Sequence, residues 1–148
     1  MPVPDDVAAK LDAMGLAPAD PVAVDRQGVL ALAALLKNEL GFTYLSYCAA
    51  AHRPASESEP DRTVVEYRVR RLPRDEVAFA VVVPTGESTP SLCALYAGAD
   101  WQEREQYDLV GTVFAGHPDL RRIMLPEDWE GHPLRRDYAI DTRHHPWR

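Results

Sequence analysis

The chain has 148 residues, of which 46% are hydrophobic and 26% are charged, and its formal net charge at pH 7 is −7. This length suits one domain that buries a substantial hydrophobic core. The negative charge argues against a nucleic-acid-binding protein, because such a protein needs a basic face to displace counterions. The apolar runs are far shorter than the ~20 residues that cross a bilayer, and the first residues lack the basic and apolar regions of a signal peptide. We therefore expect a cytoplasmic protein that meets a membrane only through a partner.

Two amphipathic helices are predicted before residue 42. In the first, over residues 5–14, three apolar side chains share one face. The second runs from Asp25, a favourable N-cap residue, to Leu40 and ends at Gly41. Between them, residues 22–24 are expected to form a short edge strand. The apolar stripe of the second helix consists of Val29, Leu32, Ala33, Leu36 and Leu40.

Three strands are predicted in the middle of the chain. Residues 42–50 are rich in aromatic side chains, residues 63–72 alternate apolar and polar side chains, and residues 76–83 follow a tight turn. The polar stretch 52–62 predicts an exposed, mobile loop. Strands joined in this way favour an antiparallel meander with helices packed on one face. The predicted fold class is therefore α+β, with a small antiparallel or mixed β-sheet.

Two short helices are predicted after the third strand. Thr89-Pro90 places a proline at the first position of the first of them. Asp100 and Glu103 have the spacing of a capping box at the start of the second, which ends at Gly111.

The last 37 residues are expected to be extended. Four prolines in residues 112–148 exclude a long helix. Such a tail needs a surface to lie against, because alone it would bury too little apolar area to offset its chain entropy. We therefore expect an α+β globular domain over residues 1–111, followed by an extended C-terminal docking tail over residues 112–148.

The charged residues near position 105 are the first candidate for chemistry. Arg104 and Asp108 are four residues apart and are expected to pair along one helix face. Glu103 and Glu105 diverge by about 200° on a helix, so they cannot act as an acid and a base on one substrate. The favoured interpretation is a solvated or partner-facing charged face.

The histidines and cysteines are the second candidate. His117 and His132 each stand in a Gly-His-Pro sequence, which predicts a corner where the ring bonds backbone groups. No two histidines have the spacing of a local metal pair, apart from the adjacent His144 and His145, whose side chains diverge in an extended chain. The two cysteines are isolated and are expected to be reduced, buried and not part of a metal site. The alternative that stays open is a metal-dependent hydrolase that uses His117, His132, Glu103 and Glu105.

Arginine clusters and one tryptophan complete the candidates. Neither Arg121-Arg122 nor Arg135-Arg136 is accompanied by a glycine-rich phosphate-binding loop, so pairing with carboxylates of another subunit is the preferred interpretation. Trp129 stands among acidic residues, as interface anchors often do, although a core position is the alternative. No arrangement of a serine or cysteine nucleophile appears.

The stretch from Ala99 to Tyr138 resembles the C subunit of respiratory complex I, which is the 30-kDa subunit of NADH:quinone oxidoreductase. The resemblance is unbroken over this stretch and weak before it. The residues that carry it are Glu103-Arg104-Glu105, Asp108-Leu109-Val110, His117, Arg121, Ile123-Met124 and the run from Asp128 to Tyr138.

This resemblance implies a non-catalytic scaffold in the peripheral arm of a proton-translocating complex. The chain would dock onto the D subunit, which helps to form the quinone pocket, and onto neighbouring cluster-bearing subunits, on the cytoplasmic side of the inner membrane. FMN, iron–sulfur clusters and quinone would be carried by partner subunits, and this chain would hold no catalytic, cofactor-binding or metal-binding residue. Related subunits also serve ferredoxin- or F420-linked dehydrogenases and membrane hydrogenases, which is the alternative for the electron donor.

The residues expected to contact partner subunits lie between positions 101 and 137. Arginines among them would make charge-assisted contacts, and the aromatic residues would be apolar anchors. The full set is Trp101, Glu103, Arg104, Glu105, Asp108, Phe114, His117, Asp119, Arg121, Arg122, Trp129, His132, Arg135, Arg136 and Asp137.

Overall fold

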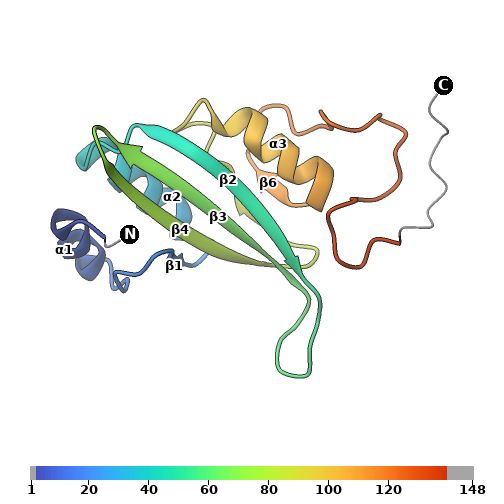
Figure 1. Ribbon diagram of the computed structural model, residues 1–148, viewed down its shortest axis with the longest axis horizontal. Coiled ribbons are helices and arrows are strands. Elements are labelled where there is room, and N and C mark those ends of the chain that lie inside the picture. The colour runs from blue at the N-terminus through green and yellow to red at the C-terminus, as the bar shows by residue number, and fades with distance from the viewer. Residues whose placement is uncertain (1–2, 140–148) are drawn as a thin grey trace.

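The computed structural model describes residues 3–139, which form a mixed β-sheet with helices on one face (Figure 1). The strands of the sheet are β1 (Val22–Val24), β2 (Tyr44–Arg53), β3 (Arg62–Arg71) and β4 (Asp75–Pro84). Their order is β1-β4-β3-β2, with β1 parallel to β4 and the other neighbours antiparallel. The predicted α+β class and the antiparallel meander are therefore confirmed.

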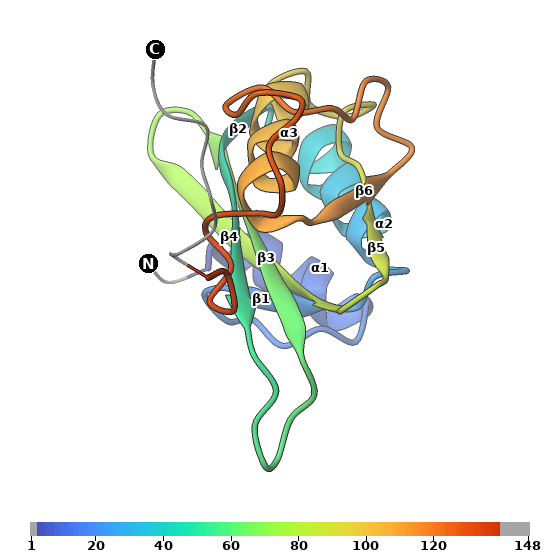
Figure 2. The ribbon, with the colours of Figure 1, turned by 90° about the vertical axis from the view of Figure 1, so that its right-hand side faces the viewer.

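Helices and a second small sheet complete the fold. The helical elements are α1 (Asp5–Ala13), α2 (Val29–Ala34), its π-helical continuation η1 (Leu35–Glu39) and α3 (Ala99–Val110). Strands β5 (Ser88–Pro90) and β6 (Val113–Ala115) form a separate parallel pair. This pair, α2 and α3 lie on the same side of the four-stranded sheet (Figure 2). Among residues 3–139, no helix is long and apolar enough to span a membrane.

The alternating sequence of β3 builds the centre of the core. Every second side chain of this strand is buried, and the rings of Tyr67 and Phe79 stack with their centroids 5.3 Å apart. Tight packing of such cross-strand pairs is what stabilises a sheet. The cross-strand core pairs between β3 and β4 are Val65–Val81, Tyr67–Phe79 and Val69–Val77.

The apolar stripe predicted around residue 33 packs onto this face, but its helix is shorter than expected. Asp25 lies before α2, where its Oδ1 accepts a hydrogen bond of 2.6 Å from the amide of Gly28. The helix then continues as η1, and Gly41 follows with a φ of 75°. A residue with a positive φ ends a right-handed helix, and glycine adopts this conformation without strain.

Helix α3 covers the edge of the sheet at β2. The side-chain oxygen of Gln102 accepts a hydrogen bond of 2.5 Å from the amide of Cys48, and that of Gln106 accepts one of 2.9 Å from the amide of Ala50. An edge strand exposes unpaired amides that can pair with other chains. These two glutamines therefore satisfy part of the edge of β2 and fix α3 against it.

The helix predicted from Thr89-Pro90 is wrong. These residues belong to β5, and Thr89 lies opposite Phe114 of β6. Local signals cannot reveal this pairing because the two strands are more than 20 residues apart, and tertiary contacts override local propensity. The chain then makes tight turns before a single helix, α3, which begins at Ala99 and has no side-chain cap. The predicted capping box is also wrong, since Glu103 bonds elsewhere.

The predicted loop over residues 52–62 is shorter than expected. Strand β2 continues to Arg53 and β3 begins at Arg62, so the connection comprises residues 54–61. His52, which had been assigned to this loop, is a buried strand residue.

Replacing Leu32 by alanine should test the packing of the α2 stripe. Leu32 is 0% exposed, so Leu32→Ala should lower the free energy of unfolding by about 2–5 kcal/mol through lost burial and a cavity. Leu30, on the same helix, is 41% exposed, and Leu30→Ala should change it by about 0.5 kcal/mol. Chemical denaturation of the two variants measures both; equal losses would contradict this orientation of α2.

Candidate functional site

Helix α3 turns most of its charged side chains inward. Glu103 and Asp108 are 0% exposed and Arg104 is 6% exposed. The predicted solvated or partner-facing charged face is therefore wrong for these three residues. Glu105 is half-buried, and Trp101 is the exposed large residue of the helix. Burying an ionisable group costs free energy unless the group is hydrogen-bonded or paired with an opposite charge. The partners of these three side chains therefore define the site.

Asp108 binds the segment that follows β6. We call residues 116–139 the return segment, because they run back past α3 (Figure 1). One carboxylate oxygen of Asp108 accepts the backbone amides of Ile123, Met124 and Leu125 at 3.0, 2.7 and 2.9 Å. The other accepts the guanidinium of Arg122 at 2.6 Å. A single buried carboxylate thereby orders three consecutive residues.

These bonds also set the ionisation of Asp108. Burial acts to raise the pKa of its carboxyl, but the hydrogen bonds from the three amides and from Arg122 outweigh it and hold the pKa below its ordinary value.

Because Asp108 is occupied by Arg122, the pairing predicted between Arg104 and Asp108 is wrong. Arg104 instead donates to the carbonyl of Arg121 at 3.3 Å.

The second Gly-His-Pro corner closes onto the end of α3. Nδ1 of His132 lies 2.8 Å from the carbonyl oxygen of Asp108, and the amide of Leu134 donates to the carbonyl of Leu109 at 2.8 Å. A Cβ atom on Gly111 would approach the ring of His132 to 2.6 Å, and its φ is 81°. Only glycine fits at position 111. Because the ring of His132 bonds the backbone carbonyl of Asp108, its predicted role at a chain corner is confirmed.

The first Gly-His-Pro corner has the same kind of role. The side chain of His117 is 0% exposed, its Nδ1 accepts the amide of Asp119 at 3.0 Å, and its Nε2 lies 3.1 Å from the carbonyl oxygen of Asp100. Since Nδ1 is an acceptor, the proton is on Nε2 and is donated to Asp100. The prediction for His117 is therefore also confirmed.

A third attachment joins the return segment to the end of β2. The buried ring of His52 accepts the amide of Arg136 at Nδ1, 3.2 Å away, and its Nε2 lies 2.7 Å from Asp61. Arg135 binds Asp137 through two hydrogen bonds of 2.9 and 2.8 Å beside this ring. The surface that orders residues 122–137 is therefore that of the same chain, and not a partner's as expected. Docking of the tail onto a partner stays a prediction.

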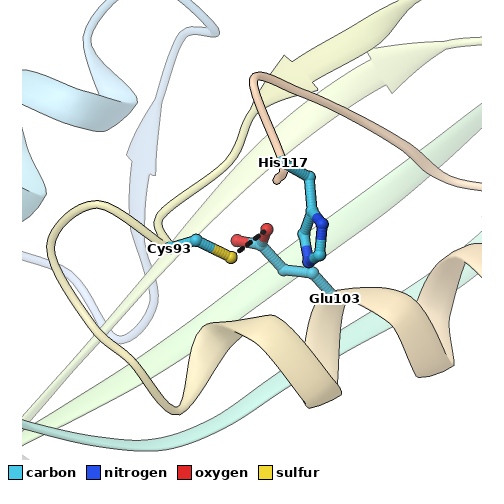
Figure 3. Close-up of side chains that lie close together, drawn as sticks. All are labelled: Cys93, Glu103 and His117. Atoms are coloured by element: carbon cyan, nitrogen blue, oxygen red, sulfur yellow. Dashed lines mark hydrogen bonds between the residues drawn. The ribbon is translucent and has the colours of Figure 1, made fainter. Parts of the chain in front are cut away.

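Beneath α3, Glu103 is the centre of a buried polar cluster. Its carboxylate accepts hydrogen bonds from the hydroxyl of Ser91 at 2.6 Å and the amide of Leu92 at 2.8 Å, with the hydroxyl of Tyr67 at 3.3 Å. Burial raises the pKa of Glu103 above its ordinary value. The thiol of Cys93 and the ring of His117 lie beside it (Figure 3).

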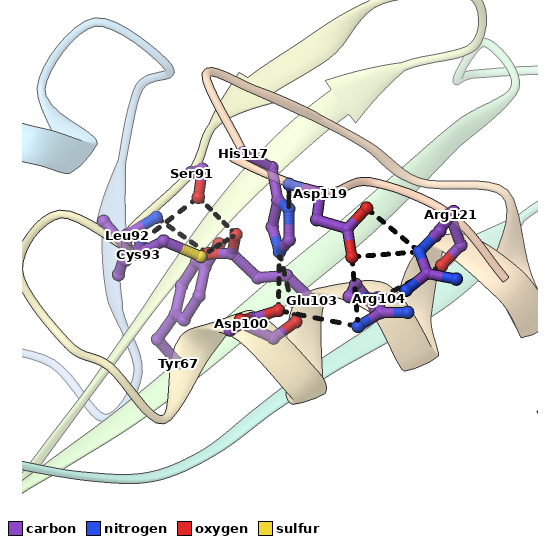
Figure 4. A network of polar contacts seen from close by, with 10 residues as sticks. All are labelled: Tyr67, Ser91, Leu92, Cys93, Asp100, Glu103, Arg104, His117, Asp119 and Arg121. Carbon is purple, nitrogen blue, oxygen red and sulfur yellow. Dashed lines mark hydrogen bonds and ion pairs between the residues drawn. The ribbon is translucent and has the colours of Figure 1, made fainter. Parts of the chain in front are cut away.

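A surface ion-pair network continues outward from this cluster. Asp119 binds Nε of Arg121 at 2.9 Å and lies 3.6 Å from Arg104 (Figure 4). The guanidinium of Arg104 lies over the ring of Trp101, 5.3 Å from its centroid. The hydrogen bonds and charge of Arg121 lower the pKa of Asp119. Helix α3 therefore contributes to both groups, through Glu103 to the buried cluster and through Arg104 to the ion-pair network.

The predicted contact residues divide into buried and exposed sets. Phe114, expected as an apolar anchor, belongs to the core, and Trp129 is half-buried. Met124 and Leu134 were not predicted as contact residues although each is 61% exposed, because the tail has no periodicity that separates inward from outward residues. The predictions for His144 and His145 fall outside the described residues. The predicted contact residues that are exposed are Trp101, Asp119, Arg121, Arg136 and Asp137.

Within residues 3–139, two groups of side chains have the proximity of metal ligands. They are Cys93, Glu103 and His117, and His52, Asp61 and Asp137. Glu105 and His132 belong to neither group. The four residues of the hydrolase alternative are therefore not brought together as one site.

Comparison with known proteins gives consistent matches. A model of the family described as "Respiratory-chain NADH dehydrogenase, 30 Kd subunit" matches residues 22–144. The C subunit of the NADH-quinone oxidoreductase of Geotalea uraniireducens is 39% identical over 121 residues, which cover 80% of this chain and 72% of that protein. The C subunit of the same enzyme from Rhizobium rhizogenes is 38% identical over 121 residues, 79% of this chain but 58% of its own length.

A solved structure has the same fold. It is the trypsin-resistant fragment (1-134) of Nqo5, which is similar with a TM-score of 0.66 and 28% sequence identity. The match covers 78% of this chain and 98% of the fragment. The similarity thus extends over most of the chain in both sequence and structure.

Asp108→Asn should release the return segment from α3. Breaking a buried carboxylate–arginine pair costs about 3–5 kcal/mol, so the opening free energy of the amides of residues 123–125 should fall by about that amount. Hydrogen exchange followed by NMR measures it residue by residue. Amides of β3 should keep their protection, because the sheet does not use this carboxylate. As a control, Asp12→Asn changes an exposed aspartate of α1 and should leave residues 123–125 protected, and unchanged protection in Asp108→Asn would refute the anchor.

The same carboxylate should contribute an acid-sensitive part of the stability. A group whose pKa is lowered on folding stabilises the protein above its unfolded pKa, and this contribution is lost as the pH falls through the folded value. The ordinary value for aspartate is 3.8. The stability difference between wild type and Asp108→Asn should therefore be constant above about pH 5 and shrink below about pH 4, as measured by denaturation at each pH. Other acids titrate in both proteins and cancel in the difference; a pH-independent difference would argue against this assignment.

Proposed function

We propose a function from one premise: the chain belongs to the family of the 30-kDa subunit of the respiratory-chain NADH dehydrogenase, whose model matches residues 22–144. It is thus a subunit of an NADH-quinone oxidoreductase, complex I, and works together with other subunits of that complex. The reaction of the whole complex is the oxidation of NADH by quinone. The relatives are named as subunits of NADH-quinone oxidoreductases, which favours NADH as the electron donor over the ferredoxin- and F420-linked alternatives.

The role we propose for this chain is that of a scaffold without catalytic residues. The observation that carries it is the use of the buried charges of α3: the carboxylate of Asp108 accepts three amides of the return segment and the guanidinium of Arg122. The same bonds hold Met124 with its side chain outward, as an exposed apolar residue beside α3. Charged groups occupied in this way organise a surface and are not free to act on a substrate.

The surface that this organisation produces has the composition of a contact site. Trp101, Arg121, Met124 and Leu134 are exposed. Tryptophan, arginine and methionine are enriched in the cores of protein interfaces, where apolar area is buried around a few polar groups. We therefore place the docking surface on the outer face of α3 and the return segment.

The partner we propose for this surface is the D subunit, with cluster-bearing subunits nearby. Iron–sulfur clusters are typically held by four cysteines, whereas the chain has two, Cys48 and Cys93. FMN, the clusters and quinone would accordingly be bound by partner subunits, and proton translocation would take place in them. The chain would lie peripherally on the cytoplasmic side of the inner membrane, held there by the complex.

Arg121→Ala should separate assembly from catalysis. Arg121 is exposed and pairs with Asp119, so its loss should spare the fold while removing a contact worth about 1.4 kcal/mol or more, a tenfold loss of affinity. We expect less assembled complex in native membranes and nearly unchanged NADH:quinone turnover per assembled complex.

A matched control is available in the turn between β3 and β4, which lies at the end of the sheet away from the return segment (Figure 1). Arg74, in the turn between β3 and β4, is also exposed, and Arg74→Ala should leave assembly unchanged. Quantifying co-purified subunits and turnover in both variants completes the test. Normal assembly with lost turnover in Arg121→Ala would overturn the scaffold role and indicate a direct part in catalysis.

A further inference from the structure

Glu103 is a buried acid without a lysine or arginine partner in the described part of the chain. Among residues 3–139, Asp108 is paired with Arg122 at 2.6 Å, but no lysine or arginine forms an ion pair with Glu103. Its carboxylate is held by neutral donors, including the hydroxyl of Ser91 and the amide of Leu92. Buried charges in proteins are usually paired with an opposite charge or bound to a metal. The negative charge of the Glu103 carboxylate is therefore not balanced by a lysine or arginine of the described residues, and a bound cation would balance it.

Two further metal-binding side chains converge on this carboxylate from separate elements. Cys93 comes from the turn after β5, Glu103 from α3, and His117 from the corner after β6 (Figure 3). A ligand atom from each lies within 4.8 Å of the other two. Sγ of Cys93 is 3.6 Å from Oε2 of Glu103. In a tetrahedral zinc site, bonds of about 2.3 Å to sulfur and 2.0 Å to oxygen place these atoms about 3.5 Å apart. This pair is thus already at ligand spacing.

A fourth ligand is available beside the histidine. Oδ1 of Asp100 is buried and accepts no hydrogen bond from the described residues. It lies 3.6 Å from Nε2 of His117, and its other charged neighbour, Arg104, is 3.9 Å away. Nitrogen and oxygen ligands of tetrahedral zinc are about 3.3 Å apart. The buried oxygen of Asp100 can therefore complete the coordination with a small movement.

We propose that Cys93, Glu103 and His117, with Asp100 as the fourth ligand, form a binding site for a divalent cation of the zinc class. Mixed sulfur, nitrogen and oxygen ligands suit zinc or cobalt, whereas magnesium and calcium prefer oxygen alone. The site goes beyond the scaffold role, and it replaces the expectation that the isolated cysteines are not metal ligands. Sequence spacing could not reveal it, since Cys93, Glu103 and His117 are at least ten positions apart in the chain.

Binding has a defined proton balance. The thiol of Cys93, which now donates to Glu103, loses its proton and becomes a thiolate ligand. The proton on Nε2 of His117 is exchanged for one on Nδ1, so the ring stays neutral while Nε2 binds the cation. One proton is released for each cation bound. The ring gives up its bonds to the carbonyl of Asp100 and the amide of Asp119. Because the cation replaces the proton of the thiol, its affinity should rise with pH.

Cobalt(II) binding to the full-length chain tests the site directly. We expect one equivalent of Co²⁺ to produce the near-ultraviolet charge-transfer absorption of a thiolate–cobalt bond, with release of one proton, and Zn²⁺ to displace it. Cys93→Ser should abolish this absorption and weaken Zn²⁺ binding at least about tenfold. Asp100→Asn, which changes a partly exposed residue, should keep the absorption and weaken binding.

The chain supplies its own control. Cys48 is outside the cluster, so Cys48→Ala should retain the absorption. The group formed by His52, Asp61 and Asp137 contains no sulfur, so cobalt bound there would not produce the band. A folded wild-type chain, verified by circular dichroism, that shows no thiolate–cobalt band in excess Co²⁺ would overturn the proposal. A band that survives in Cys93→Ser would overturn it equally.

Discussion

The carboxylate of Asp108 is the interaction on which the outer half of this molecule depends. It is buried at the end of α3 and accepts three consecutive backbone amides together with Arg122. Those amides belong to a segment without helix or strand, which has no other regular way to satisfy its buried polar groups. One charged side chain thus replaces the hydrogen bonds that secondary structure would otherwise provide, and it sets the path of the chain beyond it.

Helix α3 joins this irregular layer to the sheet. On one side, Gln102 and Gln106 bond the edge of β2, and on another Glu103 bonds the turn after β5. The helix therefore contacts the sheet, the small β5-β6 pair and the return segment at once. A surface built on such a helix is rigid, because each of its neighbours is held by buried hydrogen bonds. This rigidity suits a protein whose proposed role is to hold other subunits in place.

Parts of the fold were predictable because the relevant contacts are encoded locally. The alternation of β3 specified which face is buried, and the stripe from Val29 to Leu36 specified the inward face of α2. The helix predicted at Thr89 failed because parallel pairing with Phe114 outweighed a favourable proline position. The charged face predicted at Glu103 failed for a similar reason: a helix pattern of charges shows their spacing, but not whether another segment supplies donors to bury them.

By itself, the sequence determined the α+β class, the meander, the two Gly-His-Pro corners and the resemblance to the 30-kDa subunit family. Each of these depends on residues that are close together in the chain or on a continuous run from Ala99 to Tyr138. Only the tertiary structure decided that Asp108 anchors residues 123–125, that His52 receives the amide of Arg136, and that Cys93, Glu103 and His117 converge. The physical reason is distance along the chain: hydrogen bonds between residues 10 to 84 positions apart leave no period or local motif, and they exist only once the sheet has brought the segments together.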